Sequence, residues 1–170
     1  KYFQHLDNEK ISYRDELAIN EHSIEFKGGE MLHELGACDN CHFYGETFPK
    51  QDASTWAPNL ALTKERLNPD WVKEWLRDPQ TIMPGTKMPA PFLPTEDLLT
   101  LDGAENDWGK ELVKMNGDME AMLDGLRDYV WSIKGKTNID KTIQDYFDEN
   151  GYEFGEDEED EDDWGDDEDW

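Results

Sequence analysis

The clearest periodic pattern of apolar residues lies between residues 119 and 135. Apolar side chains recur there every three or four positions, which is the spacing of one helix face; they are Met119, Met122, Leu123, Leu126, Val130 and Ile133. Gly135 follows, and glycine commonly ends a helix. We therefore predict a helix over residues 119–133, with its methionines in the core rather than bound to a metal.

A second, shorter amphipathic pattern begins after Gly28-Gly29. We expect these two glycines to end the N-terminal arm, so that the helix begins after them. The segment Glu30 to Leu35 then places three apolar side chains on one side of a helix, namely Met31, Leu32 and Leu35. Gly36 ends this helix and leads the chain into Cys38.

A third helix is predicted to begin at Asn68-Pro69, which suit the N-cap and the first helical turn. Pro79 stops this helix. Its apolar face consists of Trp71, Val72, Trp75 and Leu76, which we expect to lie in the core. With three helices and no β-rich run, the fold class is mostly α.

These patterns divide the chain into three parts. Residues 1–27 are polar with scattered apolar side chains and are predicted to form an N-terminal arm or tether. Residues 28–135 form the helical domain, and residues 136–170 are a C-terminal extension. Thirteen acidic residues and no Lys or Arg lie in residues 153–170. We expect this acidic tail to be disordered. It should attract a basic partner, or else only add solubility.

The net charge of the chain limits the classes of partner that it can bind. The 170 residues carry a formal net charge of −26, which argues against binding nucleic acid, whose phosphates it would repel. We find no apolar run long enough to span a bilayer and no signal sequence. The first residue is Lys1, which leaves room for an anchor or an export signal before it.

The chemistry is concentrated in Cys38-Asp39-Asn40-Cys41-His42. This spacing of two thiols and an imidazole is the one that attaches a c-type haem. Cys38 and Cys41 would form thioethers with the two vinyl groups of one porphyrin, and His42 would then bind the iron from below the ring. The sequence therefore predicts one covalently bound haem c.

Three other interpretations of the cysteine pair are weaker. A structural zinc site needs four ligands, but the chain has two Cys, and its other histidines lie upstream without paired spacing; they are His5, His22 and His33. A thioredoxin-like redox pair follows a strand, whereas a helix is predicted here. A disulfide between these cysteines would close too small a loop to stabilise much. His33 lies too near the cysteines to reach the other face of a porphyrin, so we expect it at the surface or rim.

A second ligand is expected from the segment Met83-Pro84-Gly85-Thr86-Lys87-Met88-Pro89. Its prolines and glycine predict an ordered loop, and a thioether sulfur is a soft ligand that favours reduced iron. Met88 and Met83 both remain possible sixth ligands on spacing alone.

Pro58 lies in an aromatic-rich loop that runs from Phe43 to Leu60. Metal-bound histidines usually donate their second ring N–H to a carbonyl or carboxylate, and the Pro58 carbonyl is one candidate acceptor for His42. An ordinary turn proline is an equally good interpretation.

These motifs together resemble a class I c-type cytochrome over about residues 28–135, in the order of that family. The resemblance rests on the pentapeptide and on three further segments: Trp56-Ala57-Pro58-Asn59-Leu60, Trp75-Leu76-Arg77-Asp78-Pro79 and Pro84-Gly85-Thr86-Lys87-Met88-Pro89. It implies a cytochrome c-like helical domain wrapped around one haem, with His42 and Met88 as axial ligands and the Pro58 carbonyl orienting His42. It also implies that the last helix crosses the one before Cys38, with Tyr129 or Trp131 near the haem.

The chain departs from the family by an insertion of about two dozen residues at 93–117. This insertion is predicted either to cover the exposed haem edge or to form a partner surface.

The function expected from the resemblance is single-electron transfer, with no catalysis of its own, in a bacterial respiratory or other electron-transport chain. Assembly outside the cytoplasm is implied, in the periplasm or on the outer face of the cytoplasmic membrane. Redox proteins, basic ones or other subunits of a membrane complex, are the expected partners. The alternative is a haem enzyme or a gas or redox sensor in which Met88 dissociates from the iron.

Overall fold

The structure, a computed structural model, describes residues 17–151 of the chain. It consists of helices joined by loops, and strand-like pairing within these residues is confined to two isolated bridges, His42 with Ala57 and Tyr44 with Thr47. The prediction of a mostly α fold is confirmed. Residues 1–16 of the predicted arm and the acidic tail, with its predicted disorder, lie outside the described residues.

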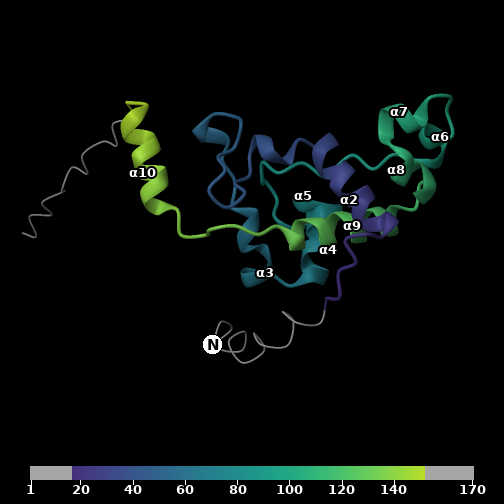
Figure 1. The fold of residues 1–170 in the computed structure, drawn as a ribbon, viewed down its shortest axis with the longest axis horizontal. Helices are drawn as coiled ribbons and strands as arrows, with labels where there is room; N and C mark the ends of the chain where they lie inside the picture. The colour runs from purple at the N-terminus through teal and green to yellow at the C-terminus, as the bar shows by residue number, and fades with distance from the viewer. Residues whose placement is uncertain (1–16, 152–170) are drawn as a thin grey trace, which may run out of the picture. The chain divides into compact units, whose positions relative to one another are not determined.

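Contacts divide the chain into two units, residues 1–137 and residues 138–170. In the second unit the structure describes helix α10, Asp140–Glu149. The α-helices of the first unit (Figure 1) are α2 Ile24–Leu35, α3 Thr63–Arg66, α4 Pro69–Arg77, α5 Pro79–Ile82, α6 Glu96–Leu99, α7 Ala104–Trp108, α8 Lys110–Met115 and α9 Met119–Ser132. None of the helices described has the length and apolar character needed to cross a membrane.

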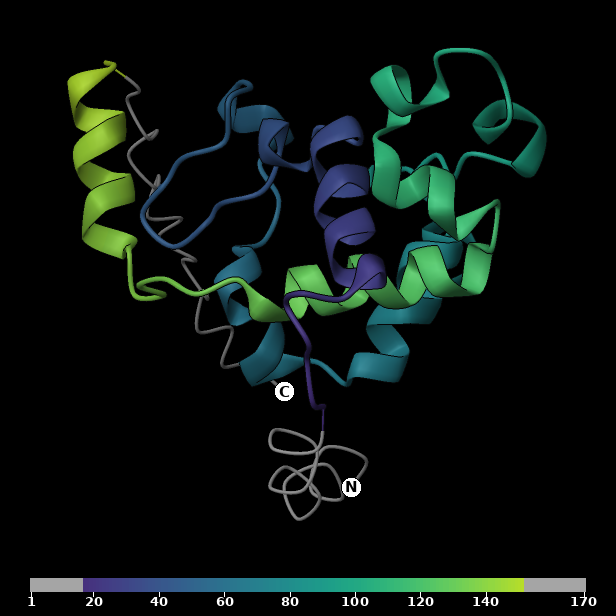
Figure 2. The ribbon, with the colours of Figure 1, turned by 45° about the vertical axis from the view of Figure 1, so that its right-hand side comes forward.

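Helices α2 and α9 cross (Figures 1 and 2), and this contact organises the first unit. Glycines from both helices lie at the crossing. A Cβ on Gly29 would lie 2.1 Å from the carbonyl carbon of Gly125, and one on Gly125 would lie 1.9 Å from the Glu25 oxygen. The two backbones can approach this closely only because neither glycine has a side chain.

This crossing corrects the predicted start of the first helix. Gly28-Gly29 does not separate the arm from the helix, because α2 begins at Ile24 and runs through both glycines. Ser23 is the N-cap, and its hydroxyl accepts a hydrogen bond from the Phe26 N–H at 3.1 Å. The glycines serve helix packing, which offsets their low helix propensity.

Helix α4 begins and ends as predicted. Asn68 caps it through hydrogen bonds from the Asp70 and Trp71 N–H groups, and Pro69 occupies the first turn. Val72 and Leu76 are buried in the core that α4 shares with α9. Trp71 differs from the prediction, because 39% of it is exposed.

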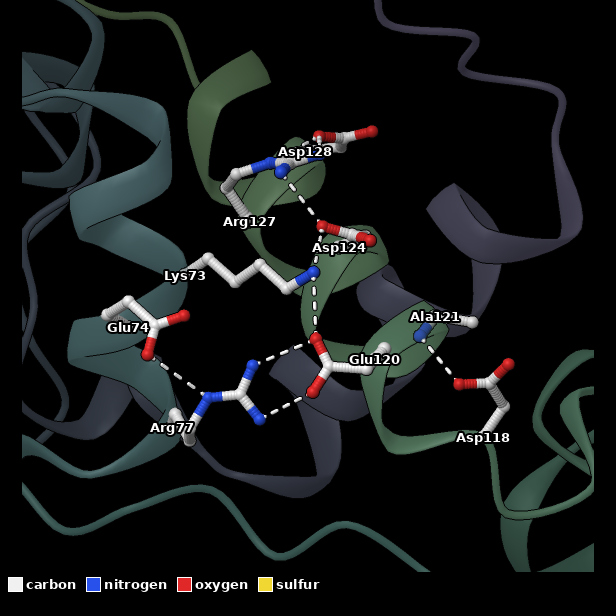
Figure 3. A network of polar contacts seen from close by, with 9 residues as sticks. All are labelled: Lys73, Glu74, Arg77, Asp118, Glu120, Ala121, Asp124, Arg127 and Asp128. Carbon is white, nitrogen blue, oxygen red and sulfur yellow. Dashed lines mark hydrogen bonds and ion pairs between the residues drawn. The ribbon is translucent and has the colours of Figure 1, made fainter.

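The outer sides of α4 and α9 are joined by ion pairs (Figure 3). Arg77 donates two hydrogen bonds to the Glu120 carboxylate, at 2.6 and 2.8 Å, in a paired arrangement. The Lys73 ammonium lies 3.0 Å from Glu120 and 2.7 Å from Asp124. These basic partners lower the pKa of Glu120 to about 2.

Glu120→Gln is expected to lower the stability of the protein in a pH-dependent way. Because the pKa of Glu120 is lower in the folded state, its contribution is present above the ordinary value of 4.5 and is lost as pH falls toward 2. Urea unfolding should therefore separate variant and wild type at pH 7, and the difference between their unfolding free energies should shrink as the pH falls toward 2. Glu105→Gln on α7 is the matched control, and a gap that persists in acid would contradict this assignment.

The insertion at 93–117 forms α6, α7 and α8, and α8 packs beside α2 (Figure 2). Leu99 and Leu112 are buried in the main core. The Met115 sulfur packs against Gly28, and a Cβ added to Gly28 would lie only 2.5 Å from it. The insertion therefore enlarges the core on the α2 side.

In α9 the predicted core positions Met122, Leu123 and Leu126 are buried, but Met119 is exposed, so its prediction as a core residue was wrong.

Candidate functional site

The cysteine pair lies in a tight helical turn directly after α2. Residues Cys38–Asn40 form one turn of 3-10 helix, entered through Ala37 in the left-handed region at φ 48°. The N–H groups of Cys41 and His42 both donate to the Cys38 carbonyl, at 3.2 and 3.0 Å. Residues three apart in such a turn lie on the same side. Both cysteines are free thiols and are partly exposed.

The His42 ring is held by the backbone of a segment that runs beside it. The Ala57 N–H donates to the Cys41 carbonyl at 2.7 Å, and the Leu60 N–H donates to the Phe43 carbonyl at 2.9 Å. This pairing brings Pro58 opposite His42, whose Nδ1 lies 2.7 Å from the Pro58 carbonyl oxygen. A carbonyl can only accept, so Nδ1 carries the proton and Nε2 keeps its lone pair for a metal. The contact considered from the sequence is thus present, and its role toward iron stays a prediction.

A buried asparagine fixes the same pair of segments. Asn59 donates from Nδ2 to the Gly45 carbonyl at 2.9 Å and accepts from the Gly45 N–H at 2.9 Å. Because the Asn59 amide makes both hydrogen bonds to one residue, it fixes the distance and the relative orientation of the two backbone segments. Asn59 therefore holds the loop after His42 against the segment that contains Pro58.

Burial changes the acid–base behaviour of the pentapeptide. It raises the pKa of the Cys38 thiol to about 11. It lowers the pKa of His42, and the Pro58 carbonyl partly opposes this. A lowered pKa keeps the imidazole neutral near pH 7, which is the form that binds metals.

His33 is buried, with 5% of its surface exposed, and this corrects its prediction as a surface or rim histidine. The Tyr44 hydroxyl is hydrogen bonded to its Nε2, and the Tyr129 ring of α9 packs 4.9 Å from its ring centre. Burial lowers the pKa of His33 to about 4. Sequence reasoning missed this position because it began the helix after Gly29. Extended to Ile24, the helix places Phe26, Gly29 and His33 on one face.

The two candidate methionine ligands have different surroundings. Met88 is partly buried and packs against the main core, and its sulfur accepts a hydrogen bond from Trp75 Nε1 at 2.8 Å. Met83 is 58% exposed. The Met88 loop is held by Gln80 of α5, which accepts from the Gly85 N–H at 3.2 Å and donates to the Thr86 carbonyl. Burial and loop contacts thus distinguish Met88 from Met83.

Two aromatic side chains of α9 were expected near the haem. Trp131 is 2% exposed, and its indole N–H has no hydrogen-bond partner within the described residues. Tyr129 instead packs edge-on against Phe26 at 5.7 Å, in the crossing with α2. Trp131 belongs to the main core, against which Met88 packs. The nearness of Tyr129 or Trp131 to a haem stays a prediction.

The donor set suits haem c by its chemistry. Two free thiols three residues apart match two vinyl groups, and the neutral His42 ring and the Met88 thioether are an axial pair known for haem iron. Among residues 17–151, no group of three or more His, Cys, Asp or Glu side chains is placed to hold a metal ion.

Part of the chain is similar to a known protein. The chain is 39% identical over 70 residues to cytochrome c oxidase subunit 2 of Bacillus subtilis (strain 168). The match covers 36% of this chain and 20% of that protein, so the chain spans about a fifth of the length of that relative. No family model and no solved structure matches the chain.

Proposed function

We propose that this protein carries single electrons through one covalently attached haem c, as a class I c-type cytochrome domain outside the cytoplasm. The observation that carries the proposal is the Cys38 to His42 turn, with the His42 ring oriented by the Pro58 carbonyl at 2.7 Å. The partial likeness to an oxidase subunit supports a redox role and suggests a respiratory chain as the setting.

Each residue of the site has a defined part in this proposal. Cys38 and Cys41 hold the porphyrin, His42 binds the iron through Nε2, and Met88 binds it through sulfur. When bound, the haem supplies an iron that changes oxidation state by one electron. Pro58 fixes the His42 ring, and Trp75 fixes the Met88 sulfur, so little rearrangement accompanies the change.

The proposed partners follow from charge and setting. A chain with a formal net charge of −26 attracts basic redox proteins, and long-range attraction raises encounter rates at low salt. Another subunit of a respiratory complex is the partner class that the likeness to an oxidase subunit favours.

Carbon monoxide binding separates an electron carrier from a haem enzyme or sensor. If His42 and Met88 occupy both axial positions, the reduced protein should bind carbon monoxide slowly and incompletely at pH 7, and it should not turn over peroxide. Met88→Ala is the positive control, because it opens one position. Fast stoichiometric binding by the unmutated protein would contradict the carrier function and favour the sensor or enzyme.

A further inference from the structure

Two stacked tryptophans connect the Met88 sulfur with the surface of α4. Trp75 donates its indole N–H to the Met88 sulfur at 2.8 Å. The Trp71 ring stacks on Trp75, one turn earlier, with ring centres 5.2 Å apart and planes inclined by 13°. Trp71 is 39% exposed, so the contacts run unbroken from a candidate iron ligand to solvent.

This exposure is unusual for the residue type and its position. Trp71 lies on the helix side that carries Trp75, and a large aromatic side chain kept half open to water gives up part of its burial energy. Exposed aromatic side chains that pack on a neighbouring ring, as Trp71 packs on Trp75, commonly act as anchors in protein interfaces. The stack is therefore better suited to a contact surface than to core packing alone.

We propose that Trp71 is the point where a redox partner docks and exchanges electrons, with Trp75 and Met88 completing the route inward. This inference rests on the proposed electron-transfer function. One electron would leave a reduced one-electron metalloprotein, which is oxidised by one electron, and would reduce the haem iron that His42 and Met88 would hold. No bond is formed or broken, no proton moves, and neither tryptophan is itself oxidised.

Exposed apolar side chains are frequent in the segment of the chain that contains Trp71. Four of the nine exposed large hydrophobic side chains in the described residues fall between residues 67 and 83; they are Leu67, Trp71, Ile82 and Met83. An exposed apolar side chain such as Trp71 is desolvated readily when a partner covers it.

Charge defines the partner. Residues 63–88 contain five basic and four acidic side chains, in a chain with 16 basic and 42 acidic residues. On α4 itself, Lys73 and Arg77 are paired with Glu120 of α9 (Figure 3). The segment that contains Trp71 is thus almost charge-balanced within a strongly acidic protein. The partner that fits is a one-electron metalloprotein with an apolar contact face and a basic rim.

The test measures second-order electron transfer from a reduced, small, basic blue copper protein to the oxidised full chain. Trp71→Leu should lower the rate constant by about tenfold or more, as expected when an aromatic anchor is removed. Trp71→Phe keeps an aromatic ring for stacking and should retain most of the rate. Phe92→Leu is the matched control, because Phe92 is also exposed and stacked, on Trp108 at 5.7 Å, and should leave the rate unchanged.

Absorption and midpoint potential are recorded first for every variant. Unchanged values in Trp71→Leu exclude a damaged iron site as the cause of a slower rate. An unchanged rate in Trp71→Leu, or an equal loss in Phe92→Leu, would overturn the docking proposal and leave the carrier function intact. A chain that takes up no haem would overturn both proposals before any kinetics are measured.

Discussion

Met88→Ala is expected to abolish the weak far-red absorption that sulfur bound to oxidised iron gives, whereas Met83→Ala should leave it in place. The structural reason is that Met88 is partly buried and receives the Trp75 N–H at 2.8 Å, while Met83 is 58% exposed. The midpoint potential should fall as well, within the roughly 0.8 V range that axial ligands span, because a thioether favours reduced iron.

Met83→Ala is the matched control, since it removes the same side chain from the same loop. Both variants should keep the helical circular dichroism of the wild type. Loss of the far-red band in Met83→Ala alone would reverse the ligand assignment. Its persistence in both variants would require a ligand other than either methionine.

Gly125→Val is expected to destabilise the protein by about 3 kcal/mol or more, at or above the upper end of the usual cost of overpacking. The added Cβ would lie 1.9 Å from the Glu25 carbonyl oxygen, where backbone rather than a flexible side chain must move. Helices α2 and α9 would have to separate along their whole contact. Urea denaturation, followed by circular dichroism, measures the loss.

Gly103→Ala is the control for this prediction. Gly103 has a conformation that suits glycine, at φ 87°, whereas Gly125 lies within helix α9. The nearest atom to a Cβ added at Gly103 is 4.0 Å away. It should therefore cost only about 1–2 kcal/mol of backbone strain. Equal losses in the two variants would show that the α2 and α9 crossing is not a tight glycine contact.

Much of the helical fold follows from local signals in the sequence. Asn68-Pro69 caps α4 where predicted, and the apolar spacing of residues 119–133 matches α9 almost to its last residue. Such signals act within one or two turns, so a single sequence contains them fully.

The errors arise where a residue serves a distant partner. Gly28-Gly29 looks like a break because its use depends on distant segments: Gly28 faces Met115 of α8, and Gly29 faces Gly125 of α9. His33 was misplaced for the same reason, since its neighbours Tyr44 and Tyr129 come from two other segments. Met119 continues the helical spacing of α9, but it is the first residue of that helix and is exposed.

The candidate site was predictable in its residue types and less so in its geometry. The pentapeptide identifies the thiols and the imidazole by spacing alone. The contact between His42 and Pro58 needs the pairing of two loops, and the Trp71, Trp75 and Met88 contacts need α4 and a loop to meet. Neither juxtaposition has a local sequence signal.

The most direct test of the central claim is the mass of the denatured polypeptide after expression together with a bacterial haem c attachment system. The wild-type chain should carry the added mass of one haem, and its alkaline pyridine spectrum should be that of a haem held by two thioethers. The Cys38→Ala, Cys41→Ala double variant should have the mass of the bare chain. A wild-type chain of unmodified mass, under conditions in which a known c-type cytochrome is fully loaded, would contradict the claim.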